Sequence, residues 1–343
     1  MSKIFLILLV IGFAEWANGH HSNDYHFDSD ISVTVEGTVR AFRFVSPHAR
    51  LVLDVVDEDG EIEAWDCELA AAVGLRRRGW TQDIFQPGEE IVIRGFAARR
   101  SDTECYFQTA EFSDGRRIAM TDTFDREPQA SVRAVTPRFS NPNIPNFSRV
   151  WRRARISGPG GGMAPGGGPR LGGPNPQAWV LSEQGRSVLE SYDPVLDDPA
   201  LTCSPVSIRR LWGNNDLTLI EQTGNLVTIT HEWMDAVRYV HLNTDGHPVG
   251  LENRRLGHSI GWYEGLALVI DTIGFEAGML AQHPGLPHSD QLHVVERLVL
   301  DESGDSFELT MVFEDALYFT DQLTETRMFE VSDEMPQRYN CTH

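Results

Sequence analysis

A histidine and an aspartate stand near the two ends of one apolar hairpin in the sequence. Residues 257–272 form two apolar runs joined by Glu264-Gly265, which suit a tight two-residue turn. Counting outward from that turn places His258 directly opposite Asp271. Directly opposed residues have Cβ atoms about 4.5–5.5 Å apart, so the carboxylate can fix the tautomer of the imidazole and raise its basicity. The spacing predicts one half of a general acid/base device; the alternative is a structural hydrogen bond that ties the ends of the hairpin.

Four more reactive residues follow shortly after this hairpin. They are His288, His293, Glu296 and Arg297, the last three in a stretch with the pattern of another strand. We take His258 as the base and Asp271 as the group that orients it, with these four as neighbours if the strands come together. On a regular strand His293 and Arg297 share one face and Glu296 takes the other, so His293 and Glu296 are not both expected to point inward.

Other reaction types fit the sequence less well. Three histidines are a known catalytic zinc set, which leaves His258, His288 and His293 as an alternative, but no H-E-x-x-H spacing is present. Neither Ser259 nor Ser289 stands in a G-x-S-x-G elbow, which disfavours a serine hydrolase. Three other histidines of this half, His231, His241 and His247, are expected at strand edges or turns rather than as ligands.

The N-terminus has the organisation of a secretory signal, which we place at residues 1–19. A cation at Lys3 precedes an apolar run of about 11 residues, too short to span a bilayer, and small residues stand at Ala17 and Gly19. We therefore expect a periplasmic or secreted protein without a transmembrane segment after cleavage. Lys3 is the one lysine of the chain, so the mature protein lacks a lysine for a Schiff base or a P-loop.

Cleavage after Gly19 would make His20 the first residue, followed by His21. A terminal histidine offers its α-amino group and its imidazole to one metal ion, and a further histidine completes a T-shaped site suited to Cu(II), called a histidine brace. His48, after a proline that can re-aim its side chain, is the third ligand that we predict. The alternative is that His20 and His21 belong to a solvated terminus.

Composition limits the partners. The chain has 343 residues, 41% of them hydrophobic, enough for two domains with substantial cores. Its formal charge of −21 disfavours nucleic acid, because binding to phosphate backbones requires clustered cations. A small-molecule ligand or substrate is the partner that we expect.

The alternation of apolar and polar residues predicts an all-β protein. In residues 20–125, three strands, a helix ending in Arg76-Arg77-Arg78 and two further strands give the order of an OB-like five-stranded barrel. The arginine run complements the helix dipole, with a basic binding patch as the alternative. Residues 126–178, rich in glycine and proline in their second half, are predicted to be a flexible linker, in which residues 151–155 could dock on an acidic domain or anchor the chain to a surface.

Residues 179–343 show about eight strands after one short helix capped by Ser182. Short turns between most of them indicate an antiparallel barrel or a sandwich. Eight strands can just enclose one small ligand, and we expect the His258–Asp271 pair to face its interior. Of the three possible pairings of four cysteines, we choose the one within domains, Cys67 with Cys105 and Cys203 with Cys341.

Several short motifs stand out in the first domain: His20-His21-Ser22, Gly37-Thr38-Val39, Pro47-His48, Leu75 to Trp80 and Pro87-Gly88-Glu89. In these motifs, roughly residues 20–120 resemble a family of uncharacterised exported bacterial proteins, a domain of unknown function. Family members tend to have Asn where this chain has Ser46. The resemblance implies export and a role for the N-terminal histidines, and it brings no substrate.

The second half also resembles the C-terminal part of other unannotated exported bacterial proteins. The shared stretches are His258 to Gly261, Asp271 to Phe275 and Pro287 to Asp290. The functional hypothesis is an exported protein that handles a small neutral or hydroxylated molecule, as a lyase, isomerase or hydrolase. The alternative is a non-catalytic protein that binds a ligand or copper.

Overall fold

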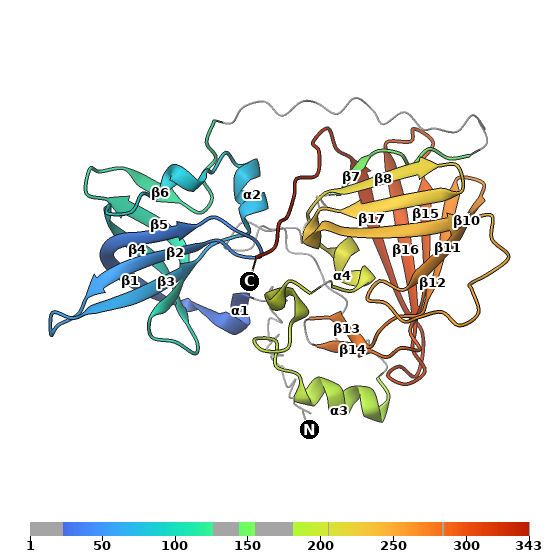
Figure 1. Ribbon diagram of the computed structural model, residues 1–343, viewed down its shortest axis with the longest axis horizontal. Helices are drawn as coiled ribbons and strands as arrows, with labels where there is room; N and C mark the ends of the chain where they lie inside the picture. The colour runs from blue at the N-terminus through green and yellow to red at the C-terminus, as the bar shows by residue number, and fades with distance from the viewer. Residues whose placement is uncertain (1–22, 126–143, 155–180, 205, 283–284, 343) are drawn as a thin grey trace, which may run out of the picture.

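The computed structural model describes residues 23–125, 144–154, 181–204, 206–282 and 285–342, which form two β domains side by side (Figure 1). The expected signal segment, residues 1–19, and most of the range 126–178 lie outside the described residues. The all-β fold predicted from the sequence is confirmed for both domains.

The N-terminal domain is a six-stranded sheet that closes on itself. The strand order is β3-β2-β1-β4-β5-β6, and a parallel pairing of β3 with β5 joins its two sides. The five longer strands thus form the predicted OB-like barrel. Its elements are α1 Asn23–His26, β1 Phe27–Arg43, β2 Arg50–Val56, β3 Ile62–Glu68, α2 Ala72–Arg77, η1 Gln82–Ile84, β4 Glu90–Ala98, β5 Glu104–Phe112 and β6 Arg117–Ala119.

Aromatic side chains fill this first barrel. Trp80 follows α2 and packs edge-on against Phe107 of β5, with ring centroids 6.4 Å apart. Phe85 packs against both rings and stacks on Phe112 at 5.7 Å. The predicted disulfide between Cys67 and Cys105 is present and joins β3 to β5 at directly paired positions. The closure of the barrel is therefore covalent as well as hydrogen-bonded.

The C-terminal domain is a second closed barrel, which has nine strands in the described part of the chain. Their order is β10-β11-β12-β15-β16-β17-β7-β8-β9. Neighbours pair antiparallel except β10 and β11, which pair in parallel because the long segment 243–257 carries the chain back across the barrel. The strands are β7 Val150–Arg153, β8 Thr218–Thr223, β9 Leu226–His231, β10 Ala236–Leu242, β11 His258–Glu264, β12 Ala267–Ile273, β15 His293–Leu300, β16 Ser306–Glu314 and β17 Leu323–Val331.

Strand β7 corrects the sequence interpretation of residues 126–178 as a linker. Val150–Arg153 pairs with β17 on one side and with β8 on the other, so it closes the barrel instead of tethering it. Trp151 is fully buried, and its indole N–H donates to the carbonyl of Phe147 at 2.9 Å. A four-residue strand with two arginines has too short an apolar alternation to be recognised from the sequence alone.

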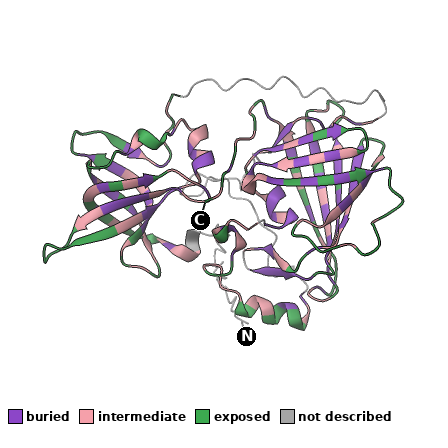
Figure 2. Cartoon of the chain, viewed as in Figure 1, coloured by how far each residue is buried: buried purple, intermediate pink, exposed green. Residues whose placement is uncertain are grey.

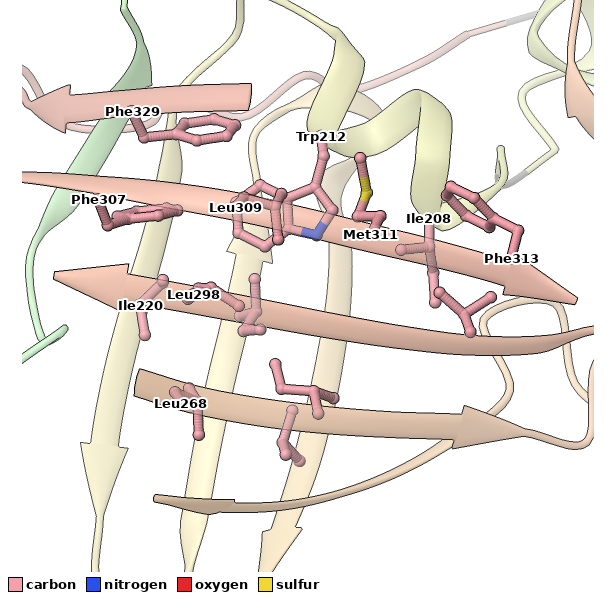
Figure 3. Packing of buried hydrophobic residues seen from close by; sticks show 14 of the residues in the cluster. Ile208, Trp212, Ile220, Leu268, Leu298, Phe307, Leu309, Met311, Phe313 and Phe329 are labelled. Atoms are coloured by element: carbon pink, nitrogen blue, oxygen red, sulfur yellow. The ribbon is translucent and has the colours of Figure 1, made fainter. Parts of the chain in front are cut away.

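Side chains fill the interior of the second barrel. The inward-facing residues of β16, Phe307, Leu309, Met311 and Phe313, are all fully buried. Helix α4 (Ile208–Gly213) directs Trp212 among them, as Figure 3 shows. The expectation that the barrel encloses a small molecule is therefore not supported by the packing of these residues. Figure 2 shows the alternation of buried and exposed positions along the strands.

Smaller elements cover one end of this barrel. The predicted helix is present as α3 Glu183–Ser191, and the hydroxyl of Ser182 accepts a hydrogen bond from the N–H of Gly185 at 3.0 Å, as a cap does. A two-stranded sheet of β13 Gly278–Ala281 and β14 Leu286–His288 lies nearby in Figure 1. Short 3-10 turns are found at Pro199–Thr202 (η3) and Trp233–Asp235 (η4).

The two domains meet along a polar seam. The guanidinium of Arg77, from the arginine run at the end of α2, forms a short ion pair with the fully buried carboxylate of Glu232. The chain after β17 returns to the first domain, where the N–H of Thr342 donates to the carbonyl of Ser46 at 2.9 Å. The second predicted disulfide, Cys203–Cys341, is also present and fixes this returning segment. The arginine run thus joins the domains in addition to ending a helix.

Candidate functional site

The hairpin of β11 and β12 turns one residue later than the sequence count places it. Glu264 pairs with Ala267, so the turn residues are Gly265 and Leu266. Gly265 has a φ of +60°, a conformation that glycine adopts without steric cost, and it takes the first turn position. Direct pairing of His258 with Asp271 is therefore wrong.

His258 and Asp271 remain diagonal neighbours on one face. His258 pairs with Ile273, and Asp271 pairs with Ile260. Because the register moves by two positions, no side chain changes face. That face is the outer one: the alternate residues Ser259 and Thr272 are buried inside the barrel, whereas His258 and Asp271 are half-buried on the outside. The expectation of an inward-facing pair is corrected accordingly.

A second histidine connects these two residues. His247, from the segment between β10 and β11, places its Nε2 2.8 Å from Asp271 Oδ1 and its Nδ1 2.8 Å from His258 Nδ1. The other carboxylate oxygen of Asp271 lies 2.8 Å from Nε2 of His293, on β15. We call His241, His247, His258, Asp271, His293 and Glu314 the outer-wall cluster.

The charge of His293 is set by two carboxylates. Its Nδ1 lies 3.0 Å from Glu314 Oε2, so both ring nitrogens face acceptors and both carry protons. The hydrogen bond to Asp271 is the main cause that raises the pKa of His293 to about 9. Partial burial works against ionisation of Asp271, but the hydrogen bonds from His293 and His247 prevail and lower the pKa of this carboxyl group. Asp271 and His293 are thus ionised at neutral pH.

The hydrogen-bond pattern also fixes the tautomer of His258. Ionised Asp271 accepts the proton of His247 Nε2; when His247 carries only this proton, its Nδ1 accepts and Nδ1 of His258 donates. The remaining nitrogen of His258, Nε2, has no hydrogen-bond partner within the described ranges. Burial, followed by repulsion from the protonated forms of His247 and His241 and from Arg254, lowers the pKa of His258. His258 Nε2 is therefore an unprotonated acceptor at neutral pH.

An imidazole stacks on this base. The rings of His241, on β10, and His258 are nearly parallel, with centroids 5.2 Å apart. The two strands pair in parallel, so these side chains lie on the same outer surface. Sequence reasoning treated His241 and His247 as strand-edge or turn residues and missed their place beside His258. No periodic pattern marks His247, which stands in the segment that connects two strands.

Glu296 and Arg297, two predicted site residues, lie apart from the cluster. Glu296 points into the barrel, where it forms a fully buried ion pair with Arg238, with Arg238 Nη2 2.5 Å from Glu296 Oε2. The indole N–H of Trp212 donates to the same carboxylate at 2.5 Å. Arg297 points outward and contacts Glu264 at 2.6 Å. The expected separation of His293 and Glu296 onto opposite faces is observed.

His288 also lies outside the cluster, on β14. It is only 5% exposed, its Nδ1 donates to the carbonyl of Ser289 at 3.1 Å, and burial lowers its pKa. A crevice of about 10 Å³, room for one water molecule, opens at this ring between Ser207 and Glu276. The structure therefore does not bring His258, His288 and His293 together as the zinc alternative requires.

Of the three predicted copper ligands, only His48 is described. His20 and His21 lie outside the described residues. His48 Nδ1 is 2.9 Å from Glu68 Oε1, and although burial opposes the charged form, this carboxylate raises the pKa of His48. Burial lowers the pKa of His26 in α1, while the charge of Glu68 acts to raise it and that of His48 to lower it. Among the described side chains, no group of three or more His, Cys, Asp or Glu is arranged to hold a metal ion.

Comparison with known protein families gives a match for the N-terminal part of the chain. A family model described as a family of unknown function, DUF6152, matches residues 8–106, which confirms the resemblance found in the sequence. No curated protein and no solved structure matches the chain. No helix in the described ranges has the length and apolar character needed to cross a membrane. The two disulfides are consistent with an extracellular or periplasmic protein.

Proposed function

We propose that the protein is an exported proton-transfer enzyme that acts on a small neutral or hydroxylated molecule at the outer-wall cluster. The observation that carries this proposal is the hydrogen-bonded chain from Asp271 through His247 to His258. It ends in an imidazole nitrogen that is free to accept a proton. The reaction would be a lyase, isomerase or hydrolase step that begins with removal of a proton.

Each residue has a distinct role in this proposal. His258 Nε2 takes the proton from the substrate or from a water molecule. His247 can then accept the Nδ1 proton of the newly formed imidazolium, and Asp271 stabilises the positive charge that develops. Charged His293 holds the Asp271 carboxylate in place through its Nε2 hydrogen bond at 2.8 Å. His293 is thus a positioning residue, whereas His258 is the catalytic base.

The cluster is sheltered enough to keep these contacts. The side chains of His247 and Asp271 are 13% and 22% exposed. Partial exclusion of water strengthens the electrostatic contacts, while access to His258 remains. The site is therefore an open one on the barrel surface rather than a closed interior pocket.

A general esterase probe tests the proposal. p-Nitrophenyl acetate is cleaved when a base activates a water molecule that attacks its carbonyl carbon, with release of p-nitrophenolate. We expect the mature protein to cleave it at least 10-fold faster than the His258→Gln variant, since a positioned base contributes about 10²–10⁴-fold. Asp271→Asn should also lower the rate, and the pH profile of the wild type should follow a pKa below about 6.5, the ordinary value for histidine.

The matched control is Arg297→Gln, which changes an outer-wall side chain that contacts Glu264 outside the cluster. Its rate should equal that of the wild type. Equal rates for the wild type and His258→Gln would contradict the proposed function. A similar loss in Arg297→Gln would show that the effect is not specific to the cluster.

We propose copper binding at the mature N-terminus as the second candidate function. It is supported by the position of His48, whose Nδ1 lies 2.9 Å from the carboxylate of Glu68, the last residue of β3. The ligands would be the α-amino group and imidazole of His20 with His48, and His21 adjacent to them. Bound copper would offer Lewis-acid or redox chemistry at this end of the molecule.

Cu(II) titration tests this candidate. The mature protein should take up one equivalent with a d–d absorption band, and His48→Gln should weaken the binding at least 10-fold, as should His20→Ala. The control is His293→Gln, in the other domain. Unchanged copper affinity in both His20→Ala and His48→Gln would contradict the brace.

A further inference from the structure

A cavity of about 370 Å³ opens on the first domain, with no histidine among its lining residues. Its wall combines the turn around η1, the short strand β6 and the residue that follows the barrel, Phe124. The lining residues are Thr81, Asp83, Ile84, Arg116, Arg117, Ile118 and Phe124. This volume falls in the range of about 300–1,000 Å³ that small-molecule sites occupy.

The apolar part of the wall is held rigidly. Ile118 is 6% exposed and belongs to the core of the barrel, and Ile84 and Phe124 pack against the same core. The Phe124 ring meets Trp80 edge-on, with centroids 5.6 Å apart, and its N–H donates to the carbonyl of Arg78 at 2.7 Å. A preformed apolar floor costs a ligand little reorganisation on binding.

Two arginines line the same cavity, and they differ in their partners. Arg116 is held by Asp114, whose carboxylate lies 2.7 Å from Nε, and its guanidinium lies 4.0 Å above the Phe112 ring. Arg117 is exposed and pairs across the sheet with Glu111, yet it makes no ion pair or side-chain hydrogen bond with any residue that the structure describes. In a chain with 50 acidic and 29 basic residues, an arginine without an acidic partner beside a cavity is an available anion site.

We propose that this cavity binds a small amphiphilic carboxylate, whose anionic group pairs with Arg117 while its apolar body lies on Ile84, Ile118 and Phe124. A guanidinium presents two parallel N–H donors to a carboxylate, which makes arginine suited to this anion. Asp83 also lines the cavity and repels a second negative charge, so the ligand is a monoanion. The proposal is independent of the outer-wall cluster.

Calorimetric titration with 3-phenylpropionate tests the proposal on the mature, full-length protein. We expect saturable binding with one site. The variant Arg117→Gln should bind at least 10-fold more weakly, because it loses the charged partner while the apolar floor stays intact. The uncharged probe 3-phenylpropan-1-ol, which has the same apolar body, should also bind the wild type at least 10-fold more weakly than the carboxylate.

The matched control is Arg94→Gln on β4, an exposed arginine that does not line the cavity. Its affinity for 3-phenylpropionate should equal that of the wild type. The proposal is overturned by any of three results: no saturable binding of the carboxylate, equal binding of the alcohol, or an equal loss of affinity in Arg94→Gln and Arg117→Gln. Far-UV circular dichroism of both variants checks that the exposed substitutions leave the barrel folded.

Discussion

The protons of the outer-wall cluster are distributed by geometry. His293 faces two carboxylates and keeps both its protons. His247 faces one carboxylate and one imidazole, so it donates to Asp271 through Nε2 and accepts from His258 at Nδ1. His293 and His258 therefore hold different charges at neutral pH, because the pKa of His293 is raised and that of His258 is lowered. This difference is the basis of any acid/base role, since a base must be neutral where its support is ionised.

Replacement of His247 should change the pKa of His258 although the His258 side chain itself is kept. In His247→Gln, we expect the pKa of His258 to rise toward its ordinary value, because repulsion from the protonated form of His247 is one of the causes that lower it. Titration of the His258 ring protons by NMR measures this shift. An unchanged pKa would show that burial alone controls His258.

The charge of His293 predicts a pH dependence of stability. Its pKa is raised to about 9, so its contribution is fully present below about pH 6.5, the ordinary pKa, and is lost as the pH rises through 9. Asp271 acts in the opposite sense: its pKa is lowered, so its contribution is present above the ordinary carboxyl pKa and is lost as the pH falls. His293 and Asp271 together therefore contribute most to the free energy of unfolding between the ordinary carboxyl pKa and about pH 6.5.

Replacement of His293 by neutral glutamine tests the direction of this pH dependence. We expect His293→Gln to lower the free energy of unfolding by about 1–2 kcal/mol at pH 6, discounted from the full shift for solvent screening. The side chain is 33% exposed, which is why the discount applies. The difference from the wild type should shrink between pH 7 and 9 in urea unfolding. A difference that grows with pH over this range would contradict the assignment.

At the scale of elements, strand alternation made most of the fold predictable. Both barrels, the Ser182 cap and the two disulfides follow from periodicity, helix signals and cysteine spacing. The face of a strand was not predictable, because a hairpin with apolar residues on both sides gives no sign of which side lies inside. In β12 four consecutive residues, from Ala267 to Ile270, are buried, so alternation identifies no outer face there.

Connections between strands account for what sequence analysis missed. The turn could be placed at Glu264-Gly265 or at Gly265-Leu266, and one residue of difference changed the partner of His258. His247 lies in a connection of irregular sequence, so only the three-dimensional path of residues 243–257 brings it to Asp271. Similarly, nothing local to Trp212 on α4 indicates that it reaches Glu296 on β15.

Helix α4 is predicted to stabilise the second barrel through one polar contact. Trp212 is fully buried, and its N–H donates to the Glu296 carboxylate that also pairs with Arg238. Trp212→Phe keeps an aromatic ring but removes this donor, so we expect a loss of about 1–3 kcal/mol in the free energy of unfolding, measured in urea. Trp262→Phe, at a position 43% exposed, is the control and should change stability by less than about 0.5 kcal/mol. Equal effects of the two substitutions would contradict a role for the buried contact.

At the scale of the whole molecule, the two barrels share a charged seam. The buried Glu232 carboxylate accepts hydrogen bonds from the N–H of Gln337 at 2.6 Å and of Leu217 at 3.1 Å, and its charge is balanced by Arg77 of the other domain. A second, exposed link joins Arg100 to Asp193 at 3.0 Å. Because a buried carboxylate depends on its cation far more than an exposed one, the first contact should govern the association of the domains.

Arg77→Gln tests the seam. It leaves Glu232 buried without its cation, for which we expect a cost of about 3–5 kcal/mol and separate unfolding of the two domains in calorimetry. Arg100→Gln, at a side chain 54% exposed, is the matched control and should cost less than about 1 kcal/mol. If the two variants unfold alike, the domains do not depend on this buried pair.

The state of the His258 ring nitrogens is the most direct test of the proposed proton-transfer site. Nitrogen-15 NMR of histidine-labelled mature protein at pH 7 distinguishes a protonated nitrogen from a free one in each ring. We predict that His258 is neutral, with the proton on Nδ1 and a free Nε2, while His293 carries protons on both nitrogens. A His258 ring that is doubly protonated, or that carries its single proton on Nε2, would contradict the relay from Asp271 through His247.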